Sequence, residues 1–60
     1  MSSKIKMVII MEKQNNKYNF TIEDYNLGEN VESSQYLTYT KCKEVLFDQL
    51  ENRLIDLTDN

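Results

Sequence analysis

Residues 4–24 read KIKMVIIMEKQNNKYNFTIED, and this stretch decides the fold of the chain. Lys4–Glu12 is apolar on both sides at its centre, which predicts a first β-strand. Lys17–Asp24 alternates apolar and polar residues, as expected of a strand with one covered face. Asparagine tolerates positive φ, so Asn15-Asn16 between the two segments predicts a tight turn. The stretch is therefore expected to form a β-hairpin.

A two-residue turn at Asn15-Asn16 also fixes which residues face each other. It places Met11 opposite Phe20 and Ile9 opposite Ile22, and alternation along a strand puts all four on one face. That face is fully apolar and also carries Ile5, Met7 and Tyr18. The other face is half apolar: it places Val8 and Ile10 opposite Thr21 and Glu23, with Tyr25 near Lys6.

The rest of the chain predicts one more strand and a helix. Tyr25–Ser33 holds the only glycine and many polar residues, so we expect a loop. Gln35–Tyr39 is rich in strand-forming residues and is predicted to be a third strand. A helix is expected over Lys41–Asp56, with Thr40 as its N-cap. The 60 residues thus predict a single α+β domain, a three-stranded antiparallel sheet packed by one C-terminal helix.

The apolar stripe of the predicted helix is wider than one sheet contact needs. Its members are Cys42, Leu46, Phe47, Leu50, Leu54 and Leu57, which together span about 140° of the helical wheel, against roughly 100° for a single contact. Either the core of a monomer is well wrapped, or a second copy covers the excess. A chain this short has a small core, which favours a homodimer. The residues assigned to the core or the dimer interface are Val8, Ile10, Leu46, Leu50 and Leu54.

Composition excludes several classes of function. The chain has a net charge of −3, which disfavours nucleic-acid binding. It has no histidine and one cysteine, Cys42, so we expect no enzyme, no metal site and no cofactor. No segment approaches the length of a membrane span or resembles a signal peptide. A free thiol fits a reducing compartment, so the cytoplasm is the expected location.

What remains is a candidate surface for binding a protein. Glu23 and Asp24 end the second strand, and two further acids, Glu29 and Glu32, follow in the loop. These acids either keep a loop soluble or surround an apolar centre of the kind that concentrates binding energy at interfaces. The candidate partner-binding residues are Glu23, Asp24, Tyr25, Gln35, Tyr36, Leu37 and Tyr39, although periodicity does not say which tyrosines serve the core.

The order of these segments resembles that of a known family. A hairpin is followed by a Tyr-x-x-Gly step (Tyr25–Gly28), a polar loop with serines, an aromatic segment ending in Tyr39 and a leucine-rich helix. This order is similar to that of the small dimeric inhibitors of uracil-DNA glycosylase made by tailed phages. The resemblance implies a DNA mimic that binds the glycosylase of the bacterial host in its DNA-binding cleft and blocks uracil excision.

The resemblance also implies roles for individual residues. The acid before the Tyr-x-x-Gly step falls on Asp24, and the tyrosine at the end of the aromatic segment falls on Tyr39. Where the family has a bulky aromatic residue, this chain has Gln35, with Tyr36 one position later. A shift of one residue changes the face of a strand, so this anchor departs from the family pattern.

Three other interpretations stay open. The order of hairpin, short strand and helix also resembles the antitoxin of HicAB-type toxin–antitoxin pairs, although that fold normally continues with a further strand. Another phage anti-defence protein of the anti-CRISPR type would share the small size and acidity. A self-associating structural module would need no foreign partner.

Overall fold

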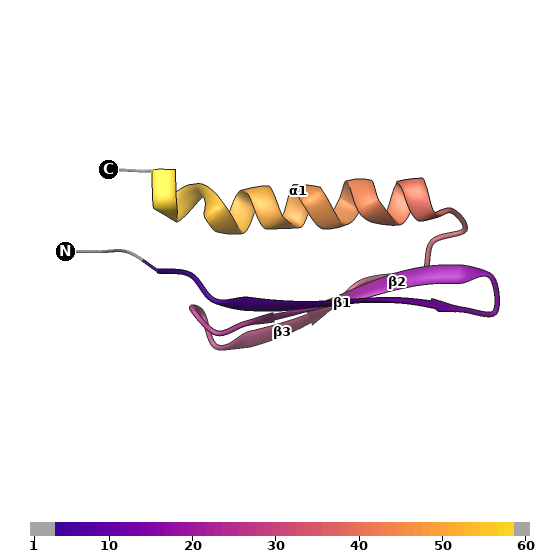
Figure 1. Ribbon diagram of the computed structural model, residues 1–60, viewed down its shortest axis with the longest axis horizontal. Helices are drawn as coiled ribbons and strands as arrows, with labels where there is room; N and C mark the ends of the chain where they lie inside the picture. Colours follow the sequence, from indigo (N-terminus) through magenta and orange to yellow (C-terminus); the bar gives the residue numbers. More distant parts are fainter. Residues whose placement is uncertain (1–3, 59–60) are drawn as a thin grey trace.

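The computed structural model describes residues 4–58 and contains a three-stranded antiparallel sheet with one helix. Strands β1 (Met7–Gln14), β2 (Lys17–Asp24) and β3 (Glu29–Glu32) lie in the order β1-β2-β3, and helix α1 (Tyr39–Thr58) follows them. Figure 1 shows α1 lying along one face of the sheet. The predicted α+β class and architecture are confirmed.

The hairpin forms as the sequence predicts. Asn15 and Asn16 both have positive φ, 52° and 61°, which is the conformation of a type I′ turn. Met11 pairs with Phe20 and Ile9 with Ile22, so the predicted register is confirmed.

The first strand is displaced from its predicted bounds of Lys4–Glu12. At the N-terminal end of this strand, the Tyr25 N–H donates a hydrogen bond of 3.0 Å to the Lys6 carbonyl. Residues before Lys6 have no strand opposite them among the described residues, so β1 begins only at Met7. At its other end the tight turn allows pairing to continue to Gln14.

The third strand lies in the segment predicted to be a loop, which corrects that prediction. A short turn follows Asp24, where the Gly28 N–H donates to the Asp24 carbonyl at 2.9 Å and Gly28 has a φ of 69°. This turn returns the chain beside β2 at Glu29, and Val31 then pairs with Ile22. The sequence of β3 is polar and therefore lacks the usual strand pattern, but its backbone pairs with the edge of β2 that β1 leaves free.

The predicted strand Gln35–Tyr39 is wrong. Only Tyr36 pairs, in an isolated bridge with Tyr18. Pairing is interrupted at Ser33, whose hydroxyl accepts the Phe20 N–H at 2.8 Å in place of a backbone carbonyl. The segment after β3 is therefore extended beside β2 without forming a regular strand.

Helix α1 begins earlier than predicted and has a different N-cap. The hydroxyl of Thr38, not of Thr40, accepts the Lys41 N–H at 3.1 Å, and the Thr38 carbonyl accepts the Cys42 N–H at 3.2 Å. The helix continues to Thr58, past the predicted end at Asp56.

The core is small and lies between β2 and α1. Phe20 and Ile22 on β2 are buried, as are Cys42 and Leu46 on α1. Burial raises the pKa of the Cys42 thiol. Partly buried residues surround this centre: Met7, Met11, Tyr18, Tyr36, Val45 and Leu50.

Candidate protein-binding surface

Asp24 is an internal anchor. It is only 3% exposed, and its Oδ1 atom accepts the backbone N–H groups of Asn26 at 2.9 Å and Leu27 at 3.1 Å. Its Oδ2 atom accepts a hydrogen bond from Arg53 Nη1 at 2.6 Å, and the same nitrogen reaches Glu29 at 3.0 Å. Asp24 therefore holds the β2–β3 turn and ties α1 to the sheet, so it does not join an exposed acidic surface.

The pKa values of this group follow from these contacts. Burial alone raises the pKa of Asp24, but the hydrogen bonds from Leu27, Arg53 and Asn26 and the charge of Arg53 outweigh it. The net result is a pKa of Asp24 below its ordinary value. The hydrogen bonds to Asp24 and Glu29 in turn raise the pKa of Arg53.

The other candidate residues form two separate groups. Glu23 and Tyr25 lie at the end of β2, where Lys6 Nζ is 5.1 Å from the centre of the Tyr25 ring. The second group lies near the start of β2, because Tyr36 bridges to Tyr18. The step from Tyr18 to Asp24 along β2 covers about 20 Å. The structure thus does not bring all of these residues into one small patch.

The second group divides into core and surface residues. Tyr18 and Tyr36 are half-buried against the core, whereas Tyr39 is 51% exposed and meets Tyr18 edge-on, with ring centres 6.1 Å apart. Gln35 and Leu37 are exposed. The two exposed tyrosines of the chain are therefore Tyr25 and Tyr39, a division that periodicity left open.

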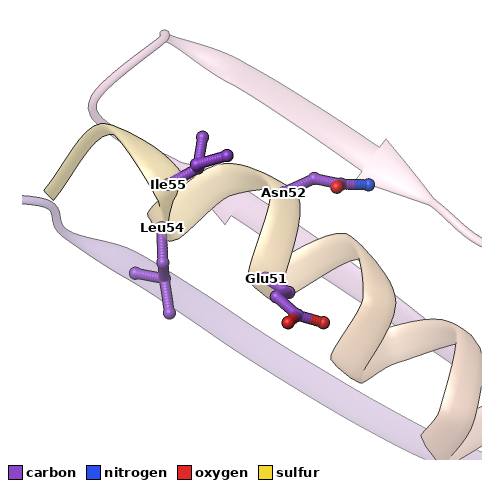
Figure 2. Close-up of a pocket in the computed structure, with 4 residues that line it drawn as sticks. All are labelled: Glu51, Asn52, Leu54 and Ile55. Carbon is purple, nitrogen blue, oxygen red and sulfur yellow. The ribbon is translucent and has the colours of Figure 1, made fainter. Parts of the chain in front are cut away.

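A surface along the edge of the sheet was not singled out by the sequence. Ile9 lies on the face that packs against α1, yet it is 42% exposed because β1 is the outer strand. Phe47 and Leu54 are seven positions apart on α1, which places them on one side of the helix, and they are 58% and 39% exposed. Figure 2 shows Leu54 directed toward the side of β1. We call Ile9, Phe47 and Leu54 the β1-side strip.

The face of the sheet away from α1 carries a second apolar group. Val8 pairs with Glu23 and Ile10 with Thr21, as predicted. Val8 and Ile10 are 37% and 43% exposed, so neither belongs to the core of one copy. Of the five residues assigned to core or interface, only Leu46 is buried, Leu50 is partly buried and the other three are exposed.

The hollow in Figure 2 lies on the outer side of α1. It is lined by Glu51, Asn52, Leu54 and Ile55, all from one helix, and has a volume of about 410 Å³. One carboxylate and one amide are its polar side chains, and no second element brings further chemical groups toward them.

Residues 4–58 contain neither a candidate metal cluster nor a helix that could span a membrane. Within this range no three His, Cys, Asp or Glu side chains gather in a way that could hold a metal ion. No helix in the described part of the chain is both long and apolar enough to cross a membrane.

Comparison with known proteins gives no relative: no family model, no curated protein and no solved structure matches this chain.

Proposed function

We propose that this chain is a non-catalytic, self-associating protein that binds another protein and inhibits it. One observation carries the proposal: among the described residues, eleven large hydrophobic side chains are exposed and only four hydrophobic residues are buried. Apolar patches exposed on this scale mark interaction surfaces in soluble proteins. Val8 and Ile10 lie on the face of the sheet away from α1, whereas the β1-side strip lies on the side of α1, and this separation suits two contacts, one with a second copy and one with a target.

The target that we propose is uracil-DNA glycosylase. The support is the order of segments that resembles the phage inhibitors, together with the net charge of −3, which favours encounter with a basic DNA-binding cleft. The cleft would be occupied by the chain as a mimic of DNA. Because Asp24 is engaged by Arg53, the acids that would stand near phosphate positions are Glu23 and Glu32, with Tyr25 and Tyr39 as exposed aromatic anchors.

The test is inhibition of uracil excision. A uracil-containing duplex is incubated with a bacterial uracil-DNA glycosylase and increasing amounts of the chain, and excision is expected to stop at a fixed molar ratio. Tyr39→Ala is expected to raise the concentration of the chain that is needed for inhibition, whereas Asn52→Ala, an exposed position on the outer side of α1, serves as a surface control outside the candidate residues. Excision that continues at an unchanged rate with excess folded protein would exclude this target.

An antitoxin-like function is the second candidate. It is favoured by the order of a hairpin, a paired third strand and then a helix. Such a protein would neutralise a co-encoded ribonuclease toxin by binding it. Co-expression with the product of the neighbouring gene tests this candidate, because only an antitoxin would restore growth of cells that make the toxin.

A further inference from the structure

The outer edge of β1 presents backbone groups that can pair with another strand. The Tyr25 N–H bonds to the Lys6 carbonyl, so Lys6 directs its backbone groups toward β2. Because this direction alternates along an antiparallel strand, Met7, Ile9 and Met11 direct their N–H and C=O groups outward. Within residues 4–58 nothing pairs with this side of β1. Such an edge is a template for strand addition.

We propose that the edge is filled by a second copy of this chain, with β1 pairing antiparallel to β1 about a two-fold axis at Ile9. The inference specifies the self-association in the proposed function and rests on it. Two-fold symmetry makes the interface self-complementary, so one register fixes every contact. With the axis at Ile9, Met7 faces Met11 of the second copy, and Val8 faces Ile10 of the second copy. Every one of these pairs joins apolar side chains.

The charges at the ends of this interface select the same register. With the axis at Ile9, Lys6 faces Glu12 of the second copy, and symmetry creates this pair twice. Lys6 and Glu12 form a non-hydrogen-bonded pair in this register, the type in which opposed side chains lie closer. An axis at Val8 would instead put Lys6 against Ile10, and an axis at Ile10 would put Glu12 against Val8. Within residues 6–12 neither alternative keeps charged and apolar residues apart, whereas the axis at Ile9 does; beyond this range Lys13 faces Ile5 of the second copy.

The helices of such a dimer would leave a space that the β1-side strip is suited to fill. Helix α1 packs on β2, and β2 strands of the two copies would be three strand spacings apart, about 14 Å. Directly packed helices are about 8–10 Å apart, so large side chains must occupy the difference. Phe47 and Leu54 lie on the side of α1 that would face this space, and Ile9 would form its floor.

The position of Phe47 along the helix places it beside the proposed axis. Tyr39 contacts Tyr18, and Arg53 bonds Asp24, so these two contacts align α1 with β2. The helix rises about 21 Å between its two contact points, and the strand rises about 20 Å. On this scale Phe47 lies about 12 Å from the first contact. Ile22, the partner of Ile9, lies about 13 Å from it. Phe47 would therefore meet Phe47 of the second copy.

Charge exchange at Lys6 and Glu12 tests both the dimer and its register. We expect sedimentation equilibrium of the wild-type chain to give a dimer. Lys6→Glu and Glu12→Lys are each expected to raise the dimer dissociation constant about tenfold, because each substitution creates two like-charge pairs across the interface. The double variant K6E/E12K is expected to restore the wild-type constant. An equimolar mixture of the two single variants is expected to form heterodimers, because both of their cross-strand pairs are then complementary.

Matched variants separate this effect from a change in net charge. Lys17→Glu on β2 and Glu44→Lys on α1 make the same charge changes away from the proposed interface and are expected to leave the constant unchanged. Circular dichroism of each variant verifies that it is folded.

Three outcomes would overturn the proposal: a wild-type monomer, equal weakening by Lys6→Glu and Lys17→Glu, or single variants that do not associate when mixed. Uracil excision measured with the same wild-type sample keeps the two proposals apart. A monomer that still blocks excision would remove the β1 pairing and leave the inhibitor, whereas a β1 dimer without inhibition would do the reverse.

Discussion

Arg53 donates a hydrogen bond to Asp24 over 2.6 Å and thereby joins the second half of helix α1 to the end of the central strand. The two residues are 29 positions apart in the chain, and both side chains are largely shielded from water. Since only four of the described hydrophobic residues are buried, this contact orients a helix that apolar packing alone holds weakly.

Loss of the Arg53 side chain should destabilise the fold more than loss of Glu29. Arg53→Gln leaves the buried Asp24 carboxylate without its opposite charge, and breaking such a pair is costly. Glu29→Gln removes a carboxylate that is half exposed, so only a small change is expected. Thermal unfolding followed by circular dichroism compares the two. Equal midpoints would mean that the Asp24–Arg53 contact does not hold the helix.

Stability should fall at acidic pH because of Asp24. Its pKa is lowered in the folded chain, so its contribution is fully present above the ordinary aspartate pKa and is lost as the pH falls through the lower, folded value. Urea unfolding between neutral and strongly acidic pH should show this loss. Asp24→Asn should be less stable at neutral pH and should have a flatter pH dependence; a profile as steep as that of the wild type would assign the titration to another group.

Two substitutions of the turn residue Asn16 should have opposite effects on stability. Asn16 has a φ of 61°, so Asn16→Gly creates the favoured Asn-Gly turn and should maintain or increase stability. Alanine tolerates this φ less well than asparagine does, so Asn16→Ala should lower the free energy of unfolding by about 1 kcal/mol. Chemical denaturation measures both, with Asn19→Ala on β2 as a reference. A stabilising alanine would contradict the turn geometry.

The neighbours Leu46 and Phe47 should separate folding from association. Leu46 is 6% exposed, so Leu46→Ala should cost about 2–5 kcal/mol of unfolding free energy. Phe47 is 58% exposed, so Phe47→Ala should barely affect the stability of one copy but should weaken the dimer. Denaturation at low concentration and sedimentation at high concentration distinguish the two effects. The reverse pattern would mean that the helix is rotated from the orientation described.

Tyr39 should matter for partner binding before it matters for folding. Half of its surface is exposed, and its contact with Tyr18 is at the ring edge. Tyr39→Ala is expected to reduce affinity for the target while the unfolding midpoint changes little, whereas Tyr36→Ala should lower the midpoint because Tyr36 packs on the core. A loss of stability with unchanged affinity per folded molecule would place Tyr39 in the core.

The hairpin could be predicted because several local signals agree. Asn15-Asn16 fixes the turn, the turn fixes the register, and the alternation in β2 agrees with both. The third strand could not be predicted in this way, since Val31 is its single apolar residue and period-two alternation is invisible in four residues. The signal that was available is Gly28, because a glycine a few residues after a strand is typical of a hairpin turn.

The candidate site was predictable only in part. The exposure of Val8, Ile10 and Tyr39 agrees with an excess of apolar surface in the sequence. The role of Asp24 was not predictable, because its partner Arg53 lies in a distant helix whose rotation depends on packing. The exposure of Ile9 was also hidden, since alternation assigns a residue to a face but does not reveal that its strand is at the edge.

Cys42 gives the chain a natural reporter of its own opening. Its side chain is fully enclosed between α1 and β2, and the raised pKa of its thiol keeps the reactive thiolate scarce. An alkylating reagent can therefore modify it only when the helix lifts from the sheet. The rate of modification, followed by mass spectrometry, would report how often that happens, without any label added to the chain.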